Sequence, residues 1–221
     1  MTQTIIVADD HPLFRAALKQ AVNQAVPDAR TVEVDSIKSL QAAIESHMDA
    51  DLILLDLNMP GAYGFSGLVF MRGQYPGLPV VVVSGSEELQ VMRRSIDYGA
   101  SGFIPKSAPL FIITQAIRAV LEGDVWLPVG VADKIERMDP DTTDFSEKLA
   151  SLTPQQFRVL GMLAEGLLNK QIAYELDVSE ATIKAHITAV FRKLGVRNRT
   201  QAVIAIQQME VDTTKQSLSG S

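Results

Sequence analysis

The feature that most constrains this chain is a regular alternation, over its first 125 residues, of short β-rich runs with longer helical stretches. Two of the runs, 52–55 and 80–83, are apolar at every position, which is typical of strands buried on both faces of a parallel sheet. Strands are predicted at Thr4–Ala8, Thr31–Val34, Asp51–Leu55, Pro79–Val83 and Gly102–Ile104. Helices are predicted near 13–26, 37–47, 65–75, 87–98 and 109–122. Five β-α units of this length predict an α/β fold, a doubly wound five-stranded parallel sheet with right-handed crossovers.

Polar side chains follow the predicted strands at the points where they end. They are Asp9 and Asp10 after the first strand, Asp56 after the third, Ser84 after the fourth and Lys106 just past the fifth. Parallel strands end at one edge of the sheet, so these side chains are expected to lie together. Taken singly, each residue fits a plainer role as a loop residue, a helix cap or a surface lysine. Their occurrence as an ordered set predicts a site.

Three neighbouring carboxylates repel one another unless a cation neutralises them, and a hard divalent ion with oxygen ligands does so. We therefore predict that Asp9, Asp10 and Asp56 hold Mg²⁺, which also brings a phosphoryl group into the site. Asp56 could then attack phosphorus as a carboxylate nucleophile. The Ser84 hydroxyl and the Lys106 ammonium would help to stabilise charge on the phosphoryl oxygens.

The remainder of the chain is organised differently. Residues 126–150 are acidic, contain two prolines and show little periodicity, which predicts a linker with one helical turn near 131–137. Residues 151–210 are predicted to form a small all-helical domain of four helices, and residues 211–221 a polar tail. Thr153, Asn169, Ser179 and Asn198 are the predicted helix caps. The second and third helices are separated by only two residues, which predicts a helix-turn-helix.

The third of these helices has two different sides. Its apolar stripe is predicted to face the core, and the opposite side carries small and basic residues that could enter the major groove of DNA. The candidate DNA-binding residues are Thr182, Lys184, Ala185, Thr188, Arg192 and Lys193. On the fourth helix, Ala202, Ile206 and Met209 lie in line and are the predicted dimer surface.

The charge is distributed unevenly along the chain. The net charge is −6, yet residues 151–221 hold 8 Lys and Arg against 6 Asp and Glu, whereas residues 1–125 hold 9 against 14. This asymmetry favours one local anionic partner. It also makes a closed form plausible, in which the acidic first domain covers the basic helix and keeps the unmodified chain monomeric.

There is no cysteine, which excludes disulfides and thiolate sites. No stretch suggests a signal peptide or a membrane span, so we expect a cytoplasmic protein that makes no membrane contact.

Residues 1–125 resemble the receiver domain of two-component response regulators, which is flavodoxin-like. The stretches that carry the resemblance are Ala8-Asp-Asp-His-Pro12 and Leu54-Leu-Asp-Leu-Asn-Met-Pro-Gly61. It implies that Asp56 accepts a phosphoryl group from a sensor histidine kinase. It also implies that Asp10, Asp56 and the Asn58 backbone carbonyl hold Mg²⁺, with Asp9 acting partly through water. Ser84 and Phe103 match the family's switch pair, and His11 is expected to be structural. Residue 107 is Ser where many receivers carry Pro.

Residues 152–205 resemble the LuxR-type helix-turn-helix through Leu152-Thr-Pro154, Asn169-Lys-Gln-Ile-Ala173 and Val178-Ser-Glu-Ala-Thr-Ile-Lys-Ala-His186. The resemblance implies that Lys184, Ala185 and Thr188 meet double-stranded DNA and that the phosphorylated protein acts as a homodimer. It implies a regulator rather than an enzyme. Two alternatives stay open. One is a phosphohydrolase with an aspartyl nucleophile, although Asn58 stands where haloacid-dehalogenase-like enzymes place a second Asp. The other is a DNA-binding regulator that is independent of phosphorylation.

Overall fold

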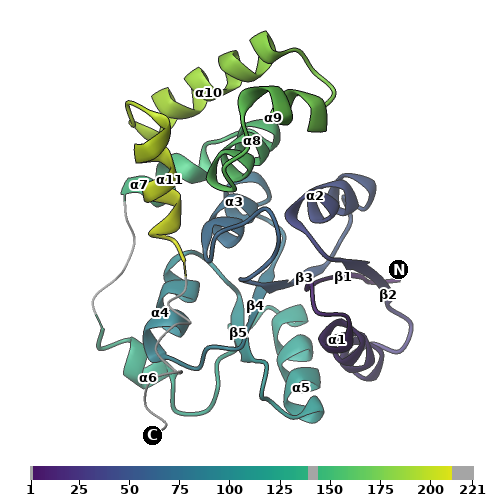
Figure 1. The fold of residues 1–221 in the computed structure, drawn as a ribbon. Helices are drawn as coiled ribbons and strands as arrows, with labels where there is room; N and C mark the ends of the chain where they lie inside the picture. The colour runs from purple at the N-terminus through teal and green to yellow at the C-terminus, as the bar shows by residue number, and fades with distance from the viewer. Residues whose placement is uncertain (1, 139–143, 211–221) are drawn as a thin grey trace, which may run out of the picture.

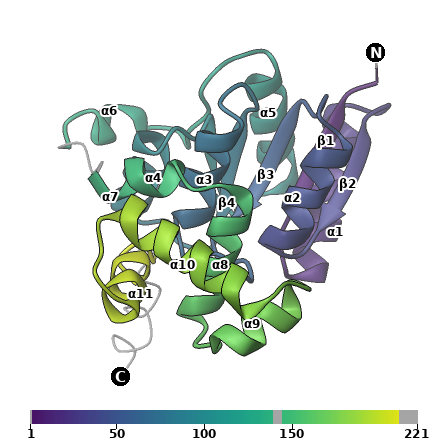
Figure 2. The same cartoon turned by 90° about the horizontal axis from the view of Figure 1, so that it is seen from above.

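The computed structural model describes residues 2–138 and 144–210. Five parallel strands form one sheet in the order β2-β1-β3-β4-β5 (Figure 1), and Figure 2 shows the same fold from above. The strands are β1 (Thr4–Ala8), β2 (Arg30–Val34), β3 (Leu52–Asp56), β4 (Val80–Ser84) and β5 (Gly102–Pro105). Every neighbouring pair is parallel. The predicted doubly wound sheet is confirmed, with strand ends that differ from the prediction by at most one residue.

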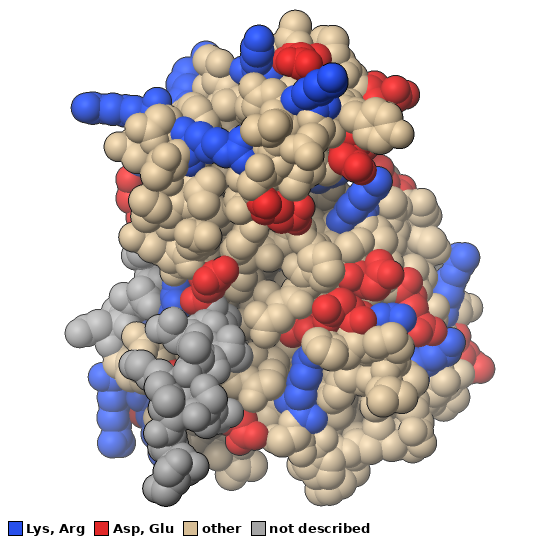
Figure 3. Space-filling view, viewed as in Figure 1, with Lys and Arg blue, Asp and Glu red and all other residues tan. Residues whose placement is uncertain are grey.

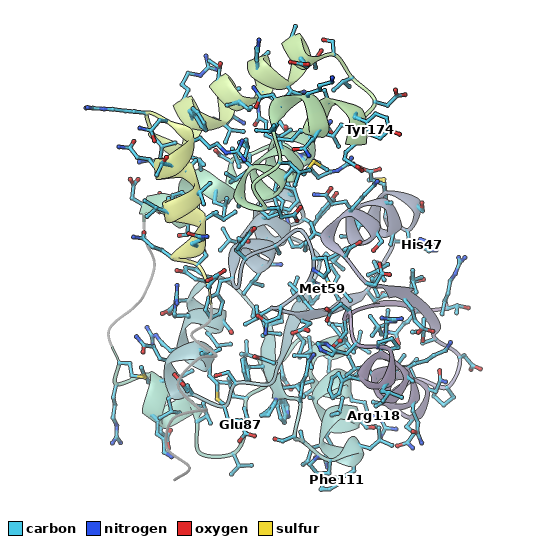
Figure 4. All side chains as sticks on the ribbon, in the orientation of Figure 1. His47, Met59, Glu87, Phe111, Arg118 and Tyr174 are labelled. Atoms are coloured by element: carbon cyan, nitrogen blue, oxygen red, sulfur yellow. The ribbon has the colours of Figure 1, made fainter. Side chains whose placement is uncertain are left out.

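Helices cover both faces of the sheet. They are α1 (Pro12–Ala25), α2 (Ile37–Ser46), α3 (Ser66–Gln74), α4 (Leu89–Asp97) and α5 (Leu110–Leu121). Ile5 and Val7 of β1 pack with α1 and α5, whereas Ile6 and Ala8 pack with the helices of the other face. This division follows from the two-residue period of a strand. The Arg118 guanidinium, labelled in Figure 4, donates to the carbonyls of Gln24 (2.7 Å) and Ala25 (3.1 Å) and joins α5 to the end of α1.

The segment predicted as a linker contains two short helices, α6 (Ala132–Ile135) and α7 (Asp144–Ala150). The first agrees with the predicted turn near 131–137. The second was not predicted, and it lies against α3, with Leu149 fully buried. Its seven residues hold few apolar positions, so tertiary packing rather than a strong local pattern explains this helix. The predicted tail, 211–221, lies outside the described residues.

Four helices follow, as expected: α8 (Pro154–Ala164), α9 (Asn169–Glu175), α10 (Glu180–Leu194) and α11 (Arg199–Gln207). Thr153 is the predicted cap of α8, and it forms a capping box with Gln156. Ser179 Oγ accepts from the Thr182 amide at α10, and Asn198 Oδ1 accepts from the Gln201 amide at α11. Asn169 is the exception, because it is the first helical residue of α9 and the side chain that bonds back is Gln171.

The helical domain docks on the face of the sheet that carries α3. The Phe157 ring of α8 stacks on the Phe70 ring of α3, with centroids 4.2 Å apart and planes inclined by 17°. The Phe65 amide donates to the Met209 carbonyl at 2.9 Å. The Gln74 side-chain amide donates to the Leu152 carbonyl at 2.9 Å. The apolar core on this face therefore continues from the sheet into the helical domain.

Candidate functional site

The predicted residues meet at the carboxyl edge of the sheet. Lys106 Nζ lies 2.8 Å from Asp9 Oδ2 and 2.8 Å from Asp56 Oδ2, so one ammonium bridges the ends of β1 and β3. Both carboxylates are buried. The Asn58 amide donates to the other Asp56 oxygen at 3.2 Å. These bonds fix the orientation of the Asp56 carboxylate at the end of its strand.

Burial and the ion pairs with Lys106 shift the pKa values of the site's ionisable groups in opposite directions. Burial raises the pKa of Asp56, Lys106 opposes this through its hydrogen bond and charge, and the Asp9 carboxylate adds to the rise. For Lys106, burial lowers the pKa, but the two carboxylates outweigh it and the net pKa is raised. The shift keeps the Lys106 ammonium charged, and a cation bound beside Asp56 would oppose the rise in its pKa, because nearby positive charge favours the carboxylate.

The donor set fits a divalent cation. Asp9, Asp10, His11 and Asp56 each offer a ligand atom, and these atoms all lie within 4.8 Å of one another. Three carboxylates face a single ammonium, so the site has an excess of negative charge. Its donors are mainly carboxylate oxygens, which are the ligands that Mg²⁺ prefers. Asp10 is the most exposed of the three carboxylates, with 33% of its side chain accessible, so a bound ion could keep water ligands there.

Two residues near the site were not predicted from the sequence to take part in its chemistry. His11 Nδ1 lies 2.7 Å from Asp10 Oδ1 and 3.4 Å from Asp9 Oδ1, which places a residue expected to be structural beside the candidate cation ligands. The Arg15 guanidinium donates to the Asp9 carbonyl at 2.6 Å. The signal available in the sequence was their position directly after the aspartates, His11 as the N-cap residue of α1 and Arg15 on its first turn.

The predicted switch pair lies on neighbouring strands. Ser84 is buried and its hydroxyl accepts from the Ser86 amide at 3.2 Å. Phe103 is fully buried in the core, so its ring already lies inside in this conformation.

Ser107, which replaces the proline of many receivers, donates through Oγ to Glu87, labelled in Figure 4. This bond connects the loop after β5 to the loop before α4.

The candidate DNA-binding face is accessible. Lys184, Ala185, Thr188 and Arg192 are exposed on α10, which lies at the end of the molecule farthest from the sheet (Figure 1). Thr182 and Lys193 are partly buried. On the face shown in Figure 3, Lys and Arg side chains gather over α10 and α11. The predicted closed form is therefore wrong about which surface the first domain covers. That domain contacts α8 and the end of α11, and it leaves the basic face of α10 exposed.

The predicted dimer stripe is not a free surface in this conformation. Ala202 and Ile206 are fully buried and Met209 is 2% exposed, within the core shared by the two domains. An apolar stripe at helical spacing looks the same in the sequence whether it is covered by a second copy of the chain or by the first domain. The sequence therefore did not distinguish these two partners. Ile204, on another side of α11, is 52% exposed.

Comparison with known proteins agrees with the prediction made for each half of the chain. Residues 5–118 match the family model described as response regulator receiver domain, and residues 150–206 match the model of bacterial regulatory proteins of the luxR family. The protein is thus a two-component response regulator, a transcription regulator that joins a receiver to a LuxR-type DNA-binding domain. The second match begins at Ala150, the last residue of α7.

Two relatives cover almost the whole chain. The glycerol metabolism activator of Pseudomonas putida is 43% identical over 206 residues, which cover 91% of this chain and 93% of that protein. The nitrate/nitrite response regulator protein NarL of Escherichia coli is 30% identical over 211 residues, with coverages of 94% and 96%. A solved structure of the Salmonella typhimurium RcsB response regulator shares the fold, with a TM-score of 0.55, 24% identity and coverages of 92% and 97%.

These relatives are regulators, and they give no support to the phosphohydrolase alternative. Within the described residues, no helix has both the length and the apolar character that crossing a bilayer requires.

Proposed function

We propose that Asp56 accepts a phosphoryl group from a sensor histidine kinase and that this modification controls the binding of double-stranded DNA by a homodimer. The observation that carries the proposal is the Lys106 ammonium held 2.8 Å from both Asp9 and Asp56 beside a third carboxylate. In this arrangement a carboxylate nucleophile, a fixed cation and a set of metal ligands meet at one sheet edge.

The transfer would exchange one bond to phosphorus for another. A carboxylate oxygen of Asp56 attacks phosphorus, the bond from phosphorus to the donor nitrogen breaks, and the imidazole of the kinase leaves with its electron pair. Lys106 would stabilise the equatorial phosphoryl oxygens, and the Ser84 hydroxyl would turn toward them. Asp9, Asp10, Asp56 and the Asn58 carbonyl would hold Mg²⁺, which supplies charge neutralisation when bound. His11, beside Asp10, would orient that ligand.

On the output side, we propose that α10 enters the major groove with Lys184, Ala185 and Thr188 as its principal contacts. Arg192 and the partly buried Thr182 and Lys193 would flank them at the phosphates. The exposure of this face supports the proposal, as does the membership of residues 150–206 in the LuxR family. Dimerisation through Ala202, Ile206 and Met209 would require the helical domain to leave the receiver first. Selection of sites from random DNA duplexes, with and without a small phosphodonor and Mg²⁺, tests whether phosphorylation and DNA binding are coupled.

Lys184→Ala is expected to weaken DNA binding. If Lys184 meets a phosphate, the loss is similar for all sequences and the slope of log K against log salt falls by about one. If it meets a base, the loss is about 1–3 kcal/mol and the preference relaxes at one position. A salt titration by fluorescence anisotropy distinguishes these results, with Lys134→Ala, an exposed lysine of α6, as the matched control. Unchanged binding would remove Lys184 from the interface.

A further inference from the structure

Two adjoining hollows lie between the receiver and the helical domain. The first has a volume of about 380 Å³ and is lined by Lys38, Gln41 and Glu45 of α2 and by Gln155 and Arg158 of α8, among others. The second, of about 200 Å³, shares Lys38 and Arg158 with the first. It continues to Pro60–Gly61 and to Glu165. The shared residues make the two hollows one interdomain cleft.

Hydrogen-bond donors converge on this cleft without acceptors of their own. Among the described residues, Lys38 and Arg158 have no ion-pair partner. Gln41 is only 4% exposed, and its Nε2 has no hydrogen-bond partner there. A buried amide donor without an acceptor costs free energy, and such groups in native proteins usually have a partner. An acceptor supplied from outside the chain would pair with Lys38 and Arg158 directly. It would pair with Gln41 once that side chain turns toward the hollow that it lines, because its Nε2 is buried in this conformation.

Two helices also begin at the cleft. Ser36, the cap of the 10-residue helix α2, lines the second hollow, and Thr153, the cap of the 11-residue helix α8, lines the first. The partial positive charge of a helix N-terminus favours an anion. Both helix ends therefore add to the field of Lys38 and Arg158. Glu45 lines the first hollow and Glu165 the second, and their carboxylates could accept hydrogen bonds from hydroxyl groups.

We propose that the interdomain cleft binds a small polyol or sugar that carries one phosphate or carboxylate group. The anionic group contacts Lys38 and Arg158, and the Gln41 amide turns from its buried position to join them. The hydroxyl groups contact Glu45 or Glu165. The two volumes are those of a metabolite-sized ligand rather than of a single ion.

The ligand would also act on the arrangement of the domains. Lys38 belongs to the receiver and Arg158 to the helical domain, so the complete donor set exists only while the two are docked. A ligand that contacts both residues binds the docked form more tightly than the undocked form. It stabilises the docked form by this difference in binding free energy. The cleft also includes Gly61, in the loop that follows Asp56, and the Gly61 carbonyl faces Gly161 of α8. Ligand binding and phosphorylation would therefore oppose each other, a consequence that rests on the proposed function, whereas the binding itself does not.

Isothermal titration of the unmodified full-length chain with glucose 6-phosphate, gluconate and glucose at constant ionic strength tests the proposal. At least one of the two anions is expected to bind with a stoichiometry of one, and glucose is not. The two anionic arms distinguish a phosphate ligand from a carboxylate ligand. Arg158→Gln and Gln41→Met are each expected to weaken binding by about tenfold, because each removes a hydrogen bond to a charged group. Arg137→Gln, an exposed arginine away from the cleft, should leave binding unchanged.

The proposal is overturned if neither anion binds, if glucose binds as tightly as the anions, or if Arg137→Gln weakens binding as much as Arg158→Gln. Lys38→Met, at an exposed position, provides a second cleft variant if the Gln41 variant does not fold, and circular dichroism establishes which variants are folded. Failure here leaves the DNA and phosphorylation experiments unaffected, because the titration uses unmodified protein without DNA.

Discussion

Asp56→Asn is expected to abolish phosphorylation. Incubation of the wild-type chain with acetyl phosphate and Mg²⁺ should add one acid-labile phosphate, which intact-mass spectrometry detects. The amide of the variant is not a nucleophile of comparable strength, and it cannot supply the negative charge that the Lys106 ammonium contacts at 2.8 Å. Asp56 is the last residue of β3, contacts Lys106 and accepts a hydrogen bond from the Asn58 amide, so its carboxylate is held in place at the sheet edge.

Asp28→Asn is the matched control, because this exposed aspartate lies before β2 and so at the opposite edge of the sheet. It should be labelled like the wild type. Asp10→Ala should retain the nucleophile but weaken Mg²⁺ binding, so that labelling needs a higher Mg²⁺ concentration. Full labelling of the Asn variant would show that another residue is the acceptor, and the proposed chemistry would then be wrong.

Gly73→Ala is expected to release the helical domain from the receiver. A Cβ at position 73 would lie 2.6 Å from the Ala150 carbonyl oxygen and 2.7 Å from the Ala150 Cβ. Contacts this short force α7 away from α3, at a cost of about 1–3 kcal/mol, which is a fivefold to hundredfold change in the docking equilibrium. Alanine favours a helix over glycine by about 1 kcal/mol, so α3 itself should not be weakened. The radius of gyration from small-angle X-ray scattering should rise.

The same variant should bind DNA more tightly without a phosphodonor, if undocking frees Ala202, Ile206 and Met209 to form a dimer. Gly77→Ala is the control, because a Cβ there has no neighbour within 4 Å. Gel-shift titrations of the two variants at equal concentration measure the difference. Equal radii of gyration and equal affinities for the two variants would mean that the contact with Ala150 does not hold the docked arrangement.

The docked arrangement also shows why the distribution of charge predicted the wrong contact surface between the two domains. An acidic receiver and a basic helix attract each other, but exposed charges are screened over about 8–10 Å at physiological salt. The contact that forms is apolar, with Phe157 on Phe70 and Met209 beside Phe65. Met59, labelled in Figure 4, belongs to the same apolar core and is 2% exposed. Burial of apolar surface outweighs long-range attraction here, so the basic face of α10 remains free.

The sequence by itself determined the five β-α units, the sheet edge that collects Asp9, Asp56, Ser84 and Lys106, and the caps at Thr153, Ser179 and Asn198. These features depend on local rules: the period of apolar residues, hydrogen bonds within one helical turn, and the fact that parallel strands end at one edge. The order of amino acids is therefore sufficient to predict the fold class of each half of the chain.

Only the tertiary structure decided which surface each apolar stripe meets. It showed that α7 forms against α3, that Ala202 and Ile206 are buried in a shared core, and that Lys38 and Arg158 line one cleft. The hydrophobic effect is not directional, so a stripe at helical spacing specifies that a surface is buried but not by what. That choice depends on the shapes of both domains together, including the glycine at position 73 that lets α7 approach α3.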